Sequence, residues 1–512
     1  MQNTHMMGVD IGTTSTKAVI FDKSGRFTAK GNIEYPLLTH NPETAEQDPD
    51  QIFDAVTKAI HTAIKAARLP SEAIEFISFS SAMHSVIAID DKGNPLTKSI
   101  TWADNRSASY AEKIKEQNGH ELYLRTGTPI HPMSPLSKLA WLHGEYPQLC
   151  EQSAKFVSIK EYIFYKWFGM YEVDYSIASA TGMFNLEQLS WDDEALKIAG
   201  VTRDKLSVPV PTTKSVKGLS VQHASQLGIH SETPFFLGAS DGVLSNLGVN
   251  AMDPGTVAVT IGTSGAIRTV TDRPITDPKG RIFCYALTDR HWVIGGAVNN
   301  GGMIFKWLRD ELCQDITLEA EKLGVNPYVG LTELAQSVPA GAHGLIFHPY
   351  LAGERAPLWN ANARGSFFGL SLNHTKSDMV RSVLEGIVYN LYTVLIALEE
   401  LIGEPVRIQA TGGFAQSPFL RQMIADIFDM EVVVPESYES SCFGACVLGL
   451  YASGEIEKLE EVKNMIGAVY THKPNEQAVK AYQQIVPVYI RLSRLFSQEY
   501  EAIAKLQKNL DL

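Results

Sequence analysis

The stretch VDIGTTSTKAV (Val9–Val19) decides the fold, because the similar stretch VTIGTSGAIRTV (Val259–Val270) returns about half a chain later. Each copy runs from apolar residues into Gly-Thr-[Thr/Ser] and then into a second apolar run, which predicts a strand, a glycine turn and a second strand. The copies differ where Asp10 of the first corresponds to Thr260 of the second. Two copies in register indicate two related domains in one chain.

The bulk composition is that of a globular protein and excludes several classes of partner. A chain of 512 residues is too long for one hydrophobic core, so about two domains are expected. With 45% hydrophobic and 20% charged residues it has no signature of disorder. The formal net charge of −13 and the lack of a basic run argue against a nucleic-acid partner. Any anionic ligand must therefore be held by a local positive site.

Cysteine usage and the start of the chain predict a cytoplasmic protein. The five cysteines are few and scattered, which suits a reducing compartment better than a disulfide framework. The opening MQNTHMMGVD lacks the basic region and apolar run of a signal peptide. No apolar stretch approaches the length of a membrane span, so no membrane partner is predicted.

Strand and helix patterns alternate in both halves. The segment at 75–90 (EFISFSSAMHSVIAID) is typical of a strand, and those at 48–67 and 377–401 show helical spacing, with Ser377 as a candidate N-cap. In RIQATGGFAQSPFLRQMIADIF, Ser417 is the predicted cap of a helix that begins at Pro418. This alternation favours an α/β fold with mixed sheets. A boundary near 247–254 gives domains at 1–247 and 248–512.

The two glycine turns are typical of sites that hold phosphate. Glycine lets the backbone approach an anion closely, and Thr and Ser hydroxyls donate to phosphate oxygens. Because the Asp10 carboxylate repels phosphate, a divalent cation between them is expected. An ordinary glycine hairpin is the alternative for either copy alone, but two copies in register favour phosphate binding. The sequence has no Gly-Lys dipeptide, which excludes a Walker A loop.

Four segments resemble signature segments of the FGGY carbohydrate kinases: DIGTTSTKAV, MSPLSKLAWL, GERAPLWNANARGSFFGLSLNH and TGGFAQSPFLRQMIADIF. Their order and spacing fit the family across nearly the whole chain. The resemblance implies two actin-like, ribonuclease-H-like domains with a nucleotide and sugar cleft between them. It also implies ATP as co-substrate, Mg²⁺ held by Asp10, and two hairpins that clamp the phosphates.

Asp241 is the candidate catalytic base. It lies in GASDGVLSNLG, where an apolar strand runs into a turn flanked by glycines. One carboxylate within hydrogen-bond reach of a hydroxyl can accept its proton as that hydroxyl attacks the γ-phosphate. An ordinary turn aspartate is the alternative, since aspartate is common in turns. In the family segment that this stretch resembles, the aspartate is the general base.

Candidate sugar-binding residues come from three segments. Met83 and His84 in SSAMHSV resemble the Met-His pair of the xylulokinase-like branch, although a histidine beside apolar residues is more often a packed core group. Trp102 and Arg106 in TWADNR match a further substrate-side segment. Arg106 is suited to bind a carboxylate in a bidentate manner, and a structural ion pair with Asp104 is its alternative.

Further positions are assigned only through the resemblance. On the sugar side Met133 falls where glycerol kinases have a substrate-contacting tyrosine, and Asp241 itself would contact the acceptor. On the nucleotide side the positions that match are Gly12, Thr13, Thr14, Ser15, Lys17, Gly262, Thr263, Ser264, Gly302, Gly412, Gly413 and Ser417. Lys17 corresponds to a basic position near the phosphates, and capping of the hairpin is its alternative role.

Within the family, MHSVIAID, WADNRS and GAVNNGGMIFKWLRDE resemble the branch that phosphorylates gluconate. The implied reaction is ATP-dependent formation of 6-phospho-D-gluconate. No residue by itself demands a carboxylate, so a ketopentose stays an alternative acceptor. A non-catalytic, ATP-dependent conformational switch is the alternative from another class. The C-terminal stretch at 489–510 is either a capping helix or the contact of a homodimer.

Overall fold

The computed structural model describes residues 4–435, 439–467 and 469–510, which form two compact units. Unit 1 contains the chain up to Pro254 together with Val270–Ile294 and Glu439–Gly467. Unit 2 contains Gly255–Thr269 and the remaining described residues that follow Ile294. Because each unit is built from separate segments, the single boundary predicted between residues 247 and 248 stays a prediction.

Unit 1 is built on a six-stranded mixed sheet with the order β13-β14-β5-β1-β2-β3. The first glycine turn joins β1 to β2 in an antiparallel pair, and β1 also pairs in parallel with β5, which pairs in parallel with β14. The strands are β1 (His5–Ile11), β2 (Ser15–Asp22), β3 (Phe27–Glu34), β5 (Ile74–Ser81), β13 (Ser215–Val216) and β14 (Phe235–Ser240).

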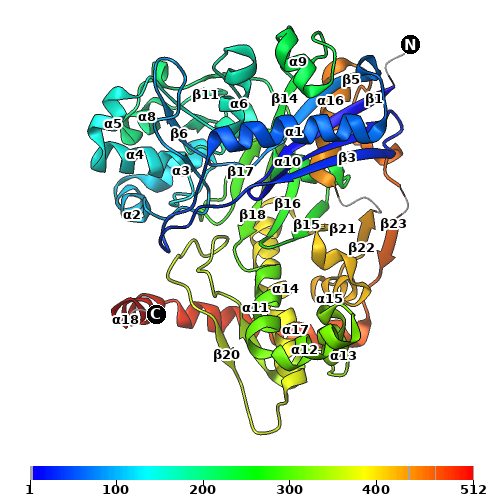
Figure 1. Ribbon diagram of the computed structural model, residues 1–512. Helices are drawn as coiled ribbons and strands as arrows, with labels where there is room; N and C mark the ends of the chain where they lie inside the picture. The colour runs from blue at the N-terminus through cyan, green and yellow to red at the C-terminus, as the bar shows by residue number, and fades with distance from the viewer. Residues whose placement is uncertain (1–3, 436–438, 468, 511–512) are drawn as a thin grey trace. The chain divides into compact units, whose positions relative to one another are not determined.

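Helices cover both faces of this sheet. Helix α1 (Pro49–Ala67) packs on β2 and β3, as predicted from its apolar spacing, and the Asp48 side chain caps its N-terminus (Figure 1). Helix α16 (Ser440–Ser453) packs on β1 and β5. Its small residues permit a close approach: a Cβ at Gly8 of β1 would lie 2.0 Å from the Cys442 carbonyl oxygen. All five cysteines are buried and none is in a disulfide, as their spacing predicts.

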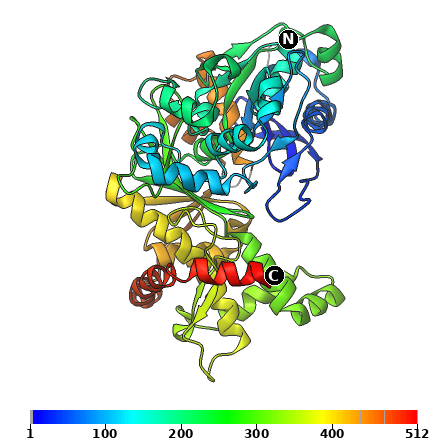
Figure 2. The same cartoon turned by 90° about the vertical axis from the view of Figure 1, so that its left-hand side faces the viewer.

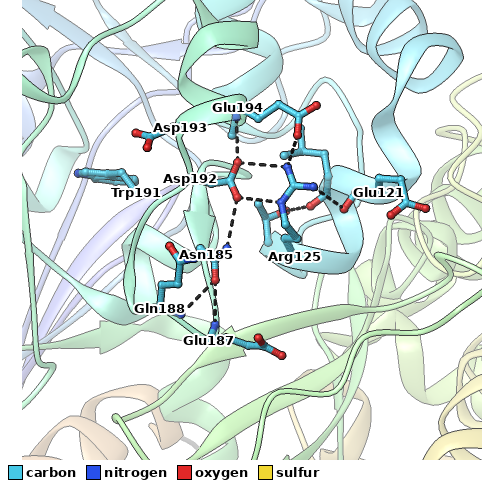
Figure 3. Close-up of polar contacts among 12 residues, drawn as sticks. Glu121, Arg125, Asn185, Glu187, Gln188, Trp191, Asp192, Asp193 and Glu194 are labelled. Carbon is cyan, nitrogen blue, oxygen red and sulfur yellow. Dashed lines mark hydrogen bonds and ion pairs between the residues drawn. The ribbon is translucent and has the colours of Figure 1, made fainter.

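The rest of unit 1 is a helical region with short strand pairs. An ion-pair cluster holds part of it together: Arg125 binds Asp192 at 2.9 Å and Glu194 at 2.7 Å (Figure 3). The remaining elements of unit 1, in this region and elsewhere, are β4 (Glu46–Gln47), β6 (Ile87–Ile89), β7 (Ser99–Ile100), α2 (Ala108–Gln117), α3 (Gly119–Thr126), α4 (Pro135–Glu145), α5 (Pro147–Gln152), β8 (Lys155–Val157), α6 (Ile159–Phe168), β9 (Glu172–Asp174), α7 (Tyr175–Ser179), β10 (Phe184–Asn185), β11 (Ser190–Trp191), α8 (Asp193–Ala199), β12 (Val208–Val210), α9 (Val221–Leu227), α10 (Asp241–Gly248) and β17 (Phe283–Ala286).

Unit 2 repeats the central pairing of unit 1. Its second glycine turn joins β15 to β16 in an antiparallel pair, while β15 pairs in parallel with β21 and β21 with β22. Strand β15 therefore corresponds to β1, and β21 to β5. The strands are β15 (Thr256–Ile261), β16 (Gly265–Thr271), β18 (Trp292–Val298), β19 (Ile346–His348), β20 (Ser366–Phe368), β21 (Arg407–Thr411), β22 (Val432–Pro435) and β23 (Val469–His472).

The helices of unit 2 centre on α14 (Lys376–Ile402), which is capped by Thr375 rather than by the predicted Ser377. By length and composition alone α14 could cross a membrane, so the expectation that no apolar stretch reaches that length is wrong. Most of α14 is buried in unit 2, and a helix enclosed by its own protein is apolar over most of its surface. The other helices are α11 (Gly302–Trp307), α12 (Gln314–Leu323), α13 (Pro327–Gln336), α15 (Pro418–Phe428), α17 (Glu476–Phe496) and α18 (Tyr500–Asn509).

Helix α17 packs against α14 within unit 2 (Figure 1 and Figure 2). A buried polar network joins the two helices. Arg381 donates to Glu385 at 2.6 Å and to the Tyr482 hydroxyl at 2.7 Å, and that hydroxyl donates to Glu385 at 2.9 Å. Each of these three buried side chains thus has a hydrogen-bond partner, which the low dielectric of a core requires. The mixed sheets with helices on their faces confirm the predicted α/β class.

Candidate functional site

The carboxyl ends of three neighbouring parallel strands form the candidate site of unit 1. Strand β1 ends just after Asp10, β5 leads into Met83 and His84, and β14 leads into Asp241. Because β14, β5 and β1 are adjacent and parallel, their carboxyl ends meet at one edge of the sheet. Ligands of α/β sheets bind at such an edge.

Asp10 is held by the strand beside it. The Ser80 hydroxyl donates to Asp10 Oδ1 at 2.7 Å, across the register of β1 with β5. Burial, followed by repulsion from the nearby Asp241 carboxylate, raises the pKa of Asp10 to about 6. Two carboxylates that repel each other are a suitable environment for a cation.

The residues present fit a Mg²⁺ ion that is shared with a phosphate ligand. No group of three or more His, Cys, Asp or Glu side chains with metal-ligand geometry occurs among the described residues. A Mg²⁺ ion at a phosphate site needs fewer protein ligands, because one or two carboxylates are completed by water and phosphate oxygens. Asp10 is the carboxylate suited to that part.

Asp241 is the first residue of α10, directly after β14. The Gly242 N–H donates to Asp241 Oδ1 at 2.7 Å, and the side chain is partly exposed at the strand end. The first turn of a helix favours a carboxylate because its N–H groups point toward it. The structure therefore places Asp241 beside Asp10 at the sheet edge, in reach of solvent.

The first hairpin presents its turn at the same edge. Gly12 donates its N–H to the Ser15 carbonyl at 3.0 Å, which closes the turn, and the side chain of Thr14 is exposed. The Trp102 indole donates to the Thr13 hydroxyl at 2.9 Å. This contact brings the predicted sugar segment to the predicted phosphate turn. Lys17, in β2, pairs with Glu439 at 3.0 Å.

A buried lysine joins two of the predicted sugar segments. Lys138 in α4 is fully buried, and its ammonium donates to the carbonyls of His84 at 2.8 Å and of Met133 at 2.5 Å. The His84 ring donates to the Ala180 carbonyl at 2.8 Å, and its backbone has φ 69°. Met83 is partly exposed, whereas Met133 is 2% exposed. Burial lowers the pKa of Lys138 to about 7.

Arg106 is engaged with carboxylates of the protein. Its Nε donates to both oxygens of Asp104 at 3.0 Å, and its guanidinium also pairs with Glu46 and lies over the Trp141 ring. This arrangement favours the structural ion pair over the predicted substrate contact. A role in binding a substrate carboxylate stays a prediction.

The nucleotide-side positions of the second half come together within unit 2. The N–H groups of Gly302 and Met303 donate to the carbonyls of Gly262 at 2.7 Å and Thr263 at 3.0 Å. Gly412 has φ 89°, and a Cβ there would lie 2.4 Å from the Ile261 carbonyl oxygen. These glycines let the start of α11 and the end of β21 approach the second hairpin.

Two neighbouring positions leave room for a ligand. Thr263 is exposed at the tip of the second hairpin, and a Cβ at Gly413 would meet nothing within 4 Å. Ser417 caps α15 with Pro418 as its first residue, as predicted, so its hydroxyl accepts from the Leu420 N–H at 3.5 Å. A flat ring could lie against backbone here.

Sequence reasoning missed four polar residues around these sites: Ser80, Lys138, Lys160 and Glu439. The signal for Lys138 was available, because a lysine inside the apolar run MSPLSKLAWL is expected to be buried with partners. Lys160 donates to the carbonyls of residues 237 and 239, and Glu439 accepts from Lys17. These partners lie far away in the sequence, so no local pattern predicts the contacts.

Comparison with known proteins assigns almost the whole chain to one family. Residues 5–248 match the FGGY family of carbohydrate kinases, N-terminal domain, and residues 257–453 match its C-terminal domain. The chain is 59% identical to gluconokinase of Bacillus subtilis (strain 168) over 509 residues, 99% of each protein. These matches confirm the family that the signature segments predict.

Solved structures share the fold. A ligand-bound xylulose kinase from Lactobacillus acidophilus superposes with a TM-score of 0.92 at 39% identity, and covers 98% of this chain and 99% of its own. A gluconate kinase from the same organism gives a TM-score of 0.90 at 39% identity with the same coverage. The predicted fold is thereby confirmed, while the roles of individual residues stay predictions.

Proposed function

We propose that this chain, which belongs to the FGGY family of carbohydrate kinases, transfers the γ-phosphoryl group of ATP to the 6-hydroxyl of D-gluconate. The products are 6-phospho-D-gluconate and ADP. The observation that carries the choice of acceptor is the identity to the Bacillus subtilis gluconokinase, which exceeds the 39% shared with the xylulose kinase structure. A ketopentose is the second candidate acceptor, since the xylulose kinase superposes as well as the gluconate kinase does.

Asp241 acts as the general base. Its carboxylate takes the proton of the 6-hydroxyl while the hydroxyl oxygen bonds to the γ-phosphorus, and the bond from phosphorus to the β,γ-bridging oxygen breaks to release ADP. Its place at the strand end supports this role, because the carboxylate is partly exposed and a backbone N–H fixes one oxygen. One positioned acid meets the need, as phosphoryl transfer depends mainly on positioning and charge.

The two hairpins hold the phosphates. Gly12, Thr13, Thr14 and Ser15 in unit 1 and Gly262, Thr263 and Ser264 in unit 2 offer N–H and hydroxyl donors at their turns, and Lys17 adds a positive charge. A Mg²⁺ ion bound by Asp10 would neutralise charge on the β- and γ-phosphates. Gly302, Gly412, Gly413 and Ser417 line the adenine side, where the absence of side chains suits a flat ring.

Gluconate lies beside Met83, His84 and Trp102 at the carboxyl edge of the unit 1 sheet. The Trp102 ring offers an apolar face, and its indole N–H already contacts the phosphate turn at Thr13. Met133 contributes through the backbone that Lys138 holds, whereas Arg106 stays paired with Asp104 and Glu46. The enzyme works in the cytoplasm, where ATP and Mg²⁺ are available. The C-terminal helices are the proposed contact of a homodimer, and light scattering, which measures the mass in solution, tests this.

The deciding experiment is an ADP-release assay with Mg²⁺ and ATP. The acceptors are D-gluconate, D-xylulose, L-ribulose and glycerol, and Asp241→Asn is the control. Turnover with gluconate that the control abolishes is the expected result. Turnover with a ketose alone would keep the mechanism and replace the acceptor. ATP binding without turnover of any acceptor would favour the conformational switch.

A further inference from the structure

The strand that carries Asp241 is held at its carboxyl end by a buried ammonium group. Lys160, in the first turn of α6, is 2% exposed, and its Nζ donates to the carbonyls of Leu237 at 3.0 Å and Ala239 at 3.2 Å. Nζ also forms an ion pair with Asp174 Oδ2, at 2.7 Å. The two carbonyls take two of the three N–H donors of the ammonium group, and the Asp174 carboxylate balances its charge.

The irregular geometry of β14 explains why these carbonyls need a partner. Strand β13 pairs with β14 only at Phe235 and Phe236, and the register of β14 with β5 shifts between Phe236 and Ala239. Residues two apart on a strand point their carbonyls to the same side. Beyond the β13 pairing, the N–H groups of Leu237 and Gly238 still donate to the carbonyls of Lys214 at 3.0 Å and Thr212 at 3.1 Å. The carbonyls of Leu237 and Ala239 accept from Lys160 instead.

Gly238 makes the shift in register possible. Its φ of 68° lies in the left-handed region, and a Cβ there would lie 1.8 Å from the Phe79 carbonyl oxygen. A strand that is bent at a glycine has little stiffness of its own. The position of the next residues therefore depends on the groups that hold them.

The end of β9 and the first turn of α7 provide two further contacts, through Asp174 and Ser176. Asp174 caps α7 by accepting from the Ile177 N–H at 3.0 Å, which leaves Oδ2 to pair with Lys160. Ser176, two residues later, accepts from the Ser240 N–H at 3.1 Å and donates to the Ser240 hydroxyl at 3.1 Å. The chain is thus fixed at residues 237, 239 and 240, immediately before Asp241.

We infer that Lys160, oriented by Asp174, is a positioning residue for Asp241. This inference rests on the proposed function, because it concerns the position of Asp241, the base of that reaction. The ammonium group fixes the carbonyls at the end of β14, and the carboxylate of Asp241 follows at the start of α10. Without this contact the strand end would shift, and a base misplaced by about 1 Å loses about 100-fold in rate.

The test uses the full chain with the double variant Lys160→Met, Asp174→Asn. Replacing Lys160 alone leaves a buried carboxylate without its cation, which endangers folding, whereas neutralising both groups removes that penalty. The matched control is Arg125→Met, Asp192→Asn, which neutralises the ion pair of Figure 3 in the same unit. Circular dichroism and thermal unfolding establish that both double variants fold.

The expected result is a fall in kcat of about 100-fold for the Lys160 double variant. Its KM values for ATP and for the acceptor that the wild type uses should stay within about 3-fold, and the Arg125 double variant should keep the wild-type kcat. A folded Lys160 double variant with wild-type kcat, or one whose loss lies in KM alone, would overturn the inference. Asp241→Asn separates the two proposals: if it keeps full kcat, the assigned base is wrong, whatever the Lys160 variant does.

Discussion

Lys17 and Glu439 form an ion pair of 3.0 Å, although they lie at opposite ends of unit 1 in sequence. Lys30 contacts the same carboxylate at 3.5 Å. The cation predicted to serve the phosphates is therefore paired with an acid of the same unit. Glu439 competes with ATP for Lys17 if both use the same ammonium group.

Glu439→Gln should lower the KM for ATP by about 3-fold, because an ion pair that solvent partly reaches is worth about 1 kcal/mol. Lys17→Met should raise the same KM by about 10-fold, since a phosphate contact is lost. Glu455→Gln is the control, because Glu455 pairs with Lys23 at 3.3 Å elsewhere in unit 1. An unchanged KM in Glu439→Gln beside a raised one in Lys17→Met would show that the pair does not compete with ATP.

Lys138→Met should raise the KM for the acceptor by about 10-fold and leave the KM for ATP unchanged. Lys138 joins the carbonyls of His84 and Met133, and leaving such buried acceptors without a donor costs about 1–3 kcal/mol each. Steady-state kinetics with each substrate varied in turn measures the effect. A purely structural lysine would instead lower the melting temperature and leave both KM values as they are.

The repeat could be predicted from sequence because its signals are local. Alternating apolar residues around Gly12 and Gly262 predict each hairpin, and the Ser417-Pro418 pair predicts the start of α15. Lys160 and Glu439 could not be found in this way, because their partners lie from 14 to 422 residues away in the sequence. The same reason hides the packing of α16 in unit 1, although its sequence lies in the second half of the chain.

The apolar character of α14, unlike its bounds, was misjudged, and for a different physical reason. A helix buried on all sides carries no polar face to interrupt its apolar run, so its composition approaches that of a membrane helix. The buried Arg381, Glu385 and Asn390 are the exceptions that mark it as a core helix. Arg106 shows the opposite case: its residue type fitted a ligand, but Asp104 and Glu46 satisfy it within the protein.

Acid should weaken unit 2 through His348. Burial lowers the pKa of His348 to about 4, and its Nε2 donates to the Tyr489 carbonyl at 3.0 Å. An unfolded histidine keeps a pKa near 6.5, so between about pH 6.5 and pH 4 the unfolded chain binds more protons than the folded one. The free energy of unfolding therefore falls as the pH is lowered through this window.

Urea unfolding of the wild type and of His348→Gln at pH 7.5 and pH 5 measures the effect. The wild type's advantage over the variant in free energy of unfolding should shrink by about 2 kcal/mol at pH 5. This pH lies about 1.5 pH units below the pKa of the unfolded histidine, and each unit corresponds to about 1.4 kcal/mol. Glutamine keeps an amide donor for Tyr489 and cannot be protonated. An advantage that is the same at both pH values would contradict the assignment.

Gly412 and Gly413 are neighbours with opposite tolerance for a side chain. Gly412 has φ 89° and would bring a Cβ to 2.4 Å from the Ile261 carbonyl oxygen, whereas Gly413 has open space within 4 Å. Gly412→Ala should therefore destabilise the protein by about 2 kcal/mol or more, because it combines a strained backbone with a clash. Gly413→Ala should leave the melting temperature unchanged.

The same pair tests the adenine side. If the ring of ATP lies against the backbone at Gly413, the added methyl group of Gly413→Ala enters its space and raises the KM for ATP without any loss of stability. Thermal unfolding and steady-state kinetics on the two variants separate these effects. A Gly413→Ala enzyme with wild-type KM for ATP would place the ring elsewhere, and a Gly412→Ala protein as stable as wild type would show that β21 can move away from β15.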